Sequence, residues 1–110
     1  FRVGRESRMS ENDRGLFVKL RILKSNFQPN NDVYLVNCTS NLEISKEHFQ
    51  IENIDNNYFI KDRNSTLGTK LNTEEIGKEK SNTLFPLNDG DIIKIGSSNS
   101  TYEFQFLILR

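Results

Sequence analysis

Apolar and polar side chains alternate along much of this chain with a period of two residues, which limits the fold to extended strands. Between residues 102 and 108 an apolar side chain occupies every second position, with Glu103 and Gln105 in between. Val18, Leu20 and Ile22 repeat this alternation. A period of two is typical of a strand that buries one face. No segment carries the i, i+3, i+4, i+7 pattern of an amphipathic helix over three turns.

Clusters of turn-forming residues separate the apolar runs. We predict further strands from short β-branched or aromatic runs at 33–36, 48–54, 58–61, 69–71, 84–85 and 91–95. The clusters between them are rich in Asn, Asp, Gly, Pro and Ser and fall at 29–32, 55–57, 63–66 and 88–91. Asp55-Asn56-Asn57 separates two alternating runs and predicts a hairpin.

Many short strands and no helix point to an all-β antiparallel sandwich or a barrel, and we take the sandwich as our prediction. Residues 5–15, 23–32 and 72–83 are the long polar connections. The chain has 110 residues, the size of one domain, and 35% of them are hydrophobic. No apolar run approaches the roughly 20 residues that a membrane helix needs, so we expect no membrane insertion.

Charge is balanced over the whole chain but uneven along it. Fifteen Lys and Arg oppose fifteen Asp and Glu, so no global field favours nucleic acid or a membrane surface. Residues 1–24, however, hold seven basic and three acidic side chains. A neutral domain with one basic region suits a partner that carries a small, local anionic group. The plainer interpretation is chance clustering on a solvated face.

Enzyme and metal chemistry find little support in the sequence. His48 is the only histidine and Cys38 the only cysteine, which leaves no zinc-ligand spacing and no internal disulfide. We therefore expect no metal, no cofactor and an intracellular, reducing location. Ser45 lies three residues before His48, but no third catalytic group is indicated and the G-x-S-x-G motif is absent. An esterase built on these two residues is the least favoured alternative.

Three separated stretches carry what an anion site needs, namely cationic side chains, hydroxyl groups and loop N–H groups. They are residues 3–6, 44–48 and 62–69. Each stretch alone is a weak signal. Because the loops at one end of a sandwich converge, three turns that are distant in sequence can build one site there.

Four motifs then occur in a fixed order. They are Gly4-Arg5, Ser45-x-x-His48, Asp62-x-x-Ser65-Thr66-x-Gly68-Thr69-x-x-Asn72, and the run LNDGDIIKIG at 87–96. Together they resemble the forkhead-associated (FHA) domain over nearly the whole chain. The resemblance implies one FHA-like domain over residues 1–110. It also implies an eleven-stranded β-sandwich that binds phosphothreonine peptides through loops at one end and has no enzymatic activity.

The resemblance also assigns peptide-binding residues. Arg5 would hold the phosphate or the peptide main chain beside it. Ser45 would donate its hydroxyl to a phosphate oxygen, and Lys46 would add a charge-assisted contact. Thr66 would contact the phosphate or line the pocket for the threonine methyl group. Leu67 stands where the family usually has Asn, whose amide grips the peptide main chain, so affinity or peptide register would differ.

Other motif residues would support the site. His48 resembles a buried family histidine that braces the binding loops without touching ligand. Gly68 and Thr69 fit the turn into the next strand, and Asn72 would cap the turn that follows. Gly4 precedes the binding arginine. We expect Arg63 and Lys70, which flank the site, to be plain surface residues.

The N-terminal region departs from the family pattern. Arg5 and Ser45 are 40 residues apart, a longer separation than usual, so we expect a long polar insertion within residues 6–32. Only three residues precede Gly4, where the family has two further strands. Either upstream strands are missing or residues 1–24 follow a different path, in which case Arg14 or Arg21 would supply the guanidinium. An FHA-shaped scaffold that binds a protein independently of phosphate remains the alternative function.

Overall fold

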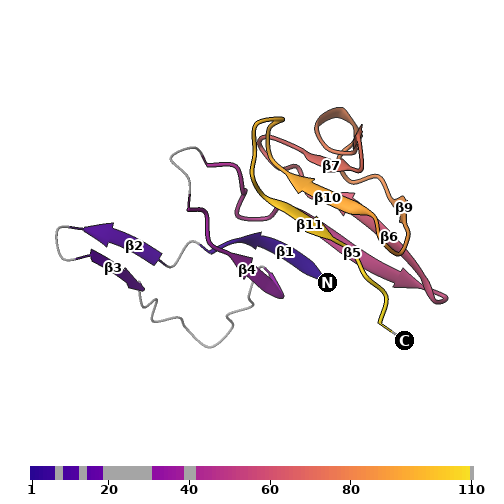
Figure 1. The fold of residues 1–110 in the computed structure, drawn as a ribbon, viewed down its shortest axis with the longest axis horizontal. Helices are drawn as coiled ribbons and strands as arrows, with labels where there is room; N and C mark the ends of the chain where they lie inside the picture. The colour runs from indigo at the N-terminus through magenta and orange to yellow at the C-terminus, as the bar shows by residue number, and fades with distance from the viewer. Residues whose placement is uncertain (7–8, 13–14, 19–30, 39–41, 110) are drawn as a thin grey trace.

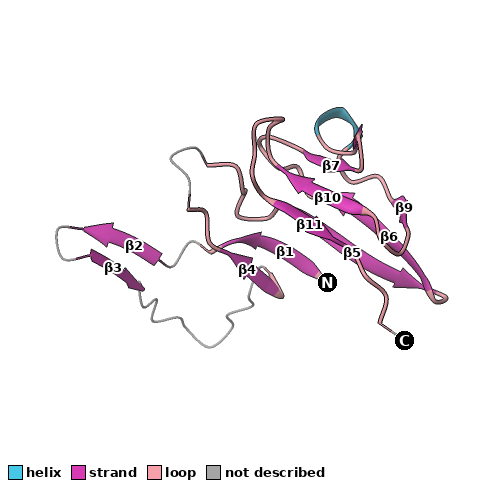
Figure 2. Cartoon of the chain, in the orientation of Figure 1, coloured by secondary structure: helices cyan, strands magenta, loops and turns pink. Residues whose placement is uncertain are grey.

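The computed structural model describes residues 1–6, 9–12, 15–18, 31–38 and 42–109 (Figure 1). These ranges contain eleven strands and one 3-10 helical turn (Figure 2). The elements are β1 (Arg2–Arg5), β2 (Met9–Asn12), β3 (Gly15–Val18), β4 (Val33–Leu35), β5 (Phe49–Ile54), β6 (Asn57–Asp62), β7 (Thr69–Leu71), β8 (Glu74–Glu75), η1 (Lys78–Lys80), β9 (Phe85–Leu87), β10 (Ile92–Ile95) and β11 (Glu103–Gln105).

The strands form two main sheets and a separate hairpin. One sheet has the order β4-β1-β5-β6-β9, and the other has the order β11-β10-β7-β8. Strands β2 and β3 pair only with each other, between β1 and β4 in the chain. The β1–β4 pair is parallel, and all other pairs are antiparallel. The predicted all-β sandwich is confirmed.

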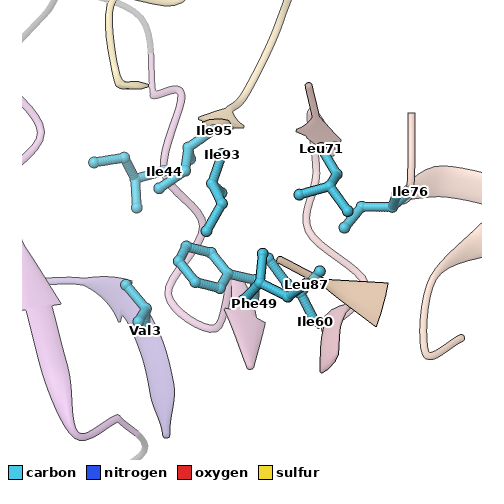
Figure 3. Packing of buried hydrophobic residues seen from close by; sticks show 9 residues of the cluster. All are labelled: Val3, Ile44, Phe49, Ile60, Leu71, Ile76, Leu87, Ile93 and Ile95. Atoms are coloured by element: carbon cyan, nitrogen blue, oxygen red, sulfur yellow. The ribbon is translucent and has the colours of Figure 1, made fainter. Parts of the chain in front are cut away.

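The core lies between the two main sheets and is mostly aliphatic (Figure 3). Both sheets contribute inward-facing side chains, and two more come from connections: Val3, Phe49, Ile60 and Leu87 from the larger sheet, Leu71, Ile93 and Ile95 from the smaller one, and Ile44 and Ile76 from loops. Ile60 and Ile95 are completely buried. Burial of such a side chain contributes about 1.5–3 kcal/mol. This core fixes the strand ends from which the loops emerge.

The β5–β6 hairpin was predicted from Asp55-Asn56-Asn57 and is confirmed. Ile54 pairs with Asn57, which leaves Asp55 and Asn56 as a two-residue turn. Their φ angles are 51° and 66°. Two successive positive φ angles define a type I′ turn, whose twist matches that of the flanking strands.

Two sequence expectations were too simple. The strand expected over 102–108 is limited to β11. The Phe106 N–H still donates in register to the Asp91 carbonyl, but the Asp91 N–H donates to the Asn88 carbonyl and the Gly90 N–H donates to the Phe106 carbonyl, which ends the regular ladder with β10. Phe104 is 39% exposed, whereas Phe106 packs on Tyr58 at a ring distance of 5.3 Å. The connections expected at 5–15 and 72–83 contain β2 and the start of β3, and β8 and η1, respectively. Beyond Val18, the expected strand 18–22 lies outside the described residues.

Candidate functional site

The sequence-predicted loops meet at one end of the sandwich. Strands β1, β4, β6 and β10 end there, and β5, β7 and β11 begin there, as their pairing directions require. We call residues 42–48 and 63–68, which connect β4 to β5 and β6 to β7, the site loops. Topology alone therefore places the site loops beside the end of β1, where Arg5 lies.

Ser45 joins three of these segments. Its carbonyl accepts a hydrogen bond from the Arg5 N–H at 2.9 Å, and its Oγ accepts one from the Thr66 N–H at 2.8 Å. Arg5 and Ser45 are half-buried, whereas Lys46 and Thr66 are exposed. Thus a guanidinium-bearing residue, an ammonium-bearing residue and two hydroxyl-bearing residues gather around one point. Leu67 is half-buried and follows Thr66 directly.

His48 is completely buried, and its ring forms hydrogen bonds to both site loops. Its Nδ1 accepts a hydrogen bond from the Ser45 N–H at 2.9 Å, and its Nε2 lies 2.8 Å from the Gly68 carbonyl oxygen. Because a carbonyl can only accept, Nε2 carries the hydrogen and the ring is neutral. Burial lowers the pKa of His48, which favours this neutral form. Both ring nitrogens are engaged by backbone groups, so the imidazole is not paired with the Ser45 hydroxyl.

Asp62 shapes the second site loop, and sequence reasoning assigned it no separate role. Its completely buried carboxylate accepts hydrogen bonds from the Ser65 N–H at 2.9 Å, from the Ser65 hydroxyl, and from the Thr69 hydroxyl at 2.6 Å. Thr69 is also completely buried. The signal in the sequence was the Asp62-x-x-Ser65 spacing, which suits a side chain that bonds to the backbone three residues later.

Two glycines permit close approaches in this region. A Cβ on Gly4 would overlap with the Lys46 carbonyl oxygen and would lie 2.5 Å from Asn31 Nδ2. Gly68 has a φ of 90°, and a Cβ there would overlap with the Glu75 carboxylate. Burial raises the pKa of Glu75. Any larger residue at position 4 would push the segment that carries Lys46 away from β1.

Not every predicted site residue lies at this end. Asn72 adopts a φ of 58° at the opposite end of β7 from Gly68. There its Oδ1 accepts from the Ile92 N–H at 3.0 Å and its Nδ2 donates to Asp91 at 3.2 Å, which ties β7 to β10. Arg14 and Arg21, the alternative phosphate ligands, lie outside the described residues.

Of the two flanking cations, one is not the plain surface residue that we expected. The Arg63 side chain is only 14% exposed and donates to Asn31 and Glu47. Lys70 is half-buried in the middle of β7, where it faces Glu75 on β8 and Lys94 on β10. No pattern around Arg63 predicted these contacts, because Asn31 and Glu47 are 32 and 16 residues away.

Known proteins identify the family. The FHA domain family matches residues 1–96, nearly the whole chain. The chain belongs to the FHA domain family. A solved structure titled as the FHA domain of a hypothetical protein from Arabidopsis thaliana is similar to it, with 28% sequence identity and a TM-score of 0.54. That similarity covers 87% of this chain and 58% of the other, so this chain spans less than two-thirds of the plant chain. No curated protein matches it.

FHA domains are generally protein-interaction modules that bind phosphopeptides, and they are not enzymes. A protein or phosphopeptide partner is therefore implied for this FHA domain. Within the described ranges no helix has the length and apolar character to cross a membrane.

Proposed function

We propose that this FHA domain recognises phosphothreonine peptides through Arg5, Ser45, Lys46 and Thr66. The observation that carries the proposal is the pair of hydrogen bonds that joins Arg5 and Thr66 to Ser45, at 2.9 and 2.8 Å. These four residues supply a guanidinium, an ammonium and two hydroxyl groups. A phosphate carries a charge of about −1.5 to −2 at pH 7 and offers three acceptor oxygens, which match these donors.

Leu67 sets the expected strength and pattern of this recognition. An apolar side chain forms no hydrogen bond with the peptide main chain, whereas the Asn that the family usually carries there does. The loss of one or two such bonds corresponds to about 1–3 kcal/mol, or one to two decades in affinity. We therefore propose binding in the micromolar range, in which the phosphate contributes most of the discrimination.

The test is a fluorescence anisotropy titration with a degenerate phosphothreonine peptide library, its unphosphorylated twin and a phosphoserine version. Binding confined to the phosphothreonine library supports the proposal. Equal binding of phosphoserine peptides would remove the threonine specificity but keep the phosphate site. Equal binding of the unphosphorylated library would favour the phosphate-independent scaffold.

Because phosphothreonine is made by kinases and Cys38 is the only cysteine, we also propose an intracellular location.

Arg5→Ala is expected to abolish detectable phosphopeptide binding and to leave the melting temperature nearly unchanged. The guanidinium is the strongest phosphate ligand proposed here, and the Arg5 contact that holds the fold comes from its backbone N–H. Arg2→Ala is the matched control, because Arg2 pairs on the surface with Asp32 at 3.3 Å. Retained affinity in a folded Arg5→Ala protein would assign the phosphate to another arginine.

A further inference from the structure

A cluster of three polar side chains, Asn31, Glu47 and Arg63, lies beside the proposed phosphate site. One guanidinium nitrogen of Arg63 donates to Asn31 Oδ1 at 2.7 Å, and the other donates to Glu47 Oε1 at 2.9 Å. We call these residues the Arg63 cluster. They come from three separate parts of the chain: the segment before β4, the first site loop, and the residue that follows β6.

Asn31 lies between Arg63 and the first site loop and forms a hydrogen bond to each. It is buried, with 3% of its surface exposed. Its Nδ2 donates to the Lys46 carbonyl at 2.7 Å, while its Oδ1 accepts from Arg63. The guanidinium can only donate and the carbonyl can only accept, so these two partners fix which way the amide points. The Lys46 carbonyl is thereby held over Gly4, next to the strand that ends in Arg5.

Arg63 also holds the loop through its main chain. The Arg63 N–H donates to the His48 carbonyl at 2.9 Å, while the Arg63 side chain reaches the Lys46 carbonyl through Asn31. Glu47 lies between these contacts and balances the guanidinium charge. Because the charge is paired with a carboxylate at close range, Arg63 adds little field at the phosphate. Its influence on binding is geometric.

We propose that Arg63 is a positioning residue of the phosphopeptide site. Acting through Asn31 and Glu47, it holds the Ser45-Lys46 pair in register with Arg5. This inference rests on the proposed function and extends it to a residue that touches neither phosphate nor peptide. Side chains held by such a supporting shell keep the precise geometry that recognition requires.

The first experiment compares phosphopeptide affinity in Arg63→Ala and Arg2→Ala, both measured by anisotropy. Each variant removes one arginine and one carboxylate pair, at 2.9 and 3.3 Å in the wild-type protein. We expect Arg63→Ala to weaken binding about tenfold, the effect of losing one or two charge-assisted hydrogen bonds. Arg2→Ala should stay within about twofold, since exposed ion pairs contribute little. Arg63→Lys keeps the charge but not the forked geometry, and should restore only part of the affinity.

Glu47→Ala separates geometry from charge and does not depend on the folding of an Arg63 variant. If Arg63 acted by attraction, removal of the carboxylate would free its charge and strengthen phosphopeptide binding, most clearly at low salt. If Arg63 acts by positioning, Glu47→Ala removes the contact that holds one guanidinium nitrogen and weakens binding. The amide NMR signals of Ser45 and Thr66 in the free protein should also shift in Glu47→Ala and stay in place in Arg2→Ala.

The outcomes are distinguishable. Wild-type binding that persists unchanged in Arg63→Ala, or that strengthens in Glu47→Ala, overturns the positioning role and leaves the proposed function intact. Equal losses in Arg63→Ala and Arg2→Ala would also overturn it, because they would indicate a general charge effect. Failure of the wild-type protein to bind any phosphopeptide would overturn both proposals together.

Discussion

The two ends of the β5–β6 hairpin differ in the sequence range of the contacts that hold them. At one end Asp55 and Asn56 turn the chain in two residues, and both are exposed. At the other end, the site loops that enter β5 and leave β6 are joined to each other by the side chains of Ser45, which is half-buried, and His48, which is completely buried. Ser45 binds Thr66 across 21 residues, and His48 binds Gly68 across 20. The first end is a local structure, and the second exists only once the sandwich has formed.

This difference predicts where mutations will cost stability. A local turn needs only residues that tolerate positive φ, so substitution there has a small effect. The site loops depend on buried groups whose partners cannot turn to water when one member is lost. An unsatisfied buried donor or acceptor costs about 1–3 kcal/mol.

Asp62→Ala should cause the greatest loss, because one carboxylate accepts from the Ser65 N–H and from the Ser65 and Thr69 hydroxyls. We expect the free energy of unfolding to fall by about 3 kcal/mol or more. Urea denaturation measures it. Asp62→Asn keeps one oxygen acceptor in the same volume and should lose less. A loss below about 1 kcal/mol in Asp62→Ala would show that the loop does not depend on this buried carboxylate.

His48→Ala should lower both stability and peptide affinity. It removes the acceptor of the Ser45 N–H, takes the His48 donor from the Gly68 carbonyl while the Gly96 N–H stays, and leaves a cavity. We expect a loss of about 2–4 kcal/mol by urea denaturation, with weaker phosphopeptide binding. Asn53→Ala, at the exposed far end of β5, is the control and should change stability by less than about 0.5 kcal/mol. An unchanged melt in His48→Ala would contradict the bracing role.

Acidification should loosen the site-loop end through the same residue. Burial lowers the pKa of His48 below its ordinary value of 6.5, so the unfolded state takes up the proton first. The contribution of neutral His48 to the free energy of unfolding is complete above pH 6.5. It declines as the pH falls from there toward the pKa of the folded state, by at most about 1.4 kcal/mol per pH unit. Glu75, whose pKa is raised by burial, has the opposite sign: its stabilising contribution declines as the pH rises above 4.5.

The measurement is urea stability between pH 5 and 8 in the wild-type protein and in His48→Ala, with their difference taken at each pH. The difference removes the Glu75 contribution, because both proteins share it. The difference in free energy of unfolding between the wild-type protein and His48→Ala should shrink as the pH falls below 6.5. A difference that is constant with pH would show that His48 titrates as it does in the unfolded chain.

Asn56→Gly tests the local end and should have the smallest effect. Asn56 has a φ of 66°, which glycine adopts without steric cost. We expect a gain of about 0.5 kcal/mol and no change in phosphopeptide affinity, measured by urea denaturation and anisotropy. A loss above about 1 kcal/mol would show that this turn also depends on its side chain.

The candidate site could be predicted from sequence where its residues lie in short motifs, and not where they act across the fold. The order of Gly4-Arg5, Ser45-x-x-His48 and Ser65-Thr66 led to the loops that the structure brings together. Asn31, Glu47 and Arg63 form no motif, and two of their contacts cross 32 and 16 residues. Nothing in the sequence near Arg63 distinguished a buried, paired guanidinium from a solvated one.

Sequence alone was enough to predict strands β4–β7, β9 and β10, the sandwich class and the β5–β6 turn, because these follow from period-two alternation and from the φ preferences of a few residues, whereas β1, β2 and β8 lie outside the predicted runs. The exposure of Phe104 on an edge strand, the neutral form of His48 and the pairing of Arg63 with Asn31 and Glu47 follow only from the packed fold. The two groups of features differ in the range over which the responsible interactions act. Periodicity and turn geometry act between neighbours in the chain, whereas burial and long-range hydrogen bonds depend on which segments the packed core brings together.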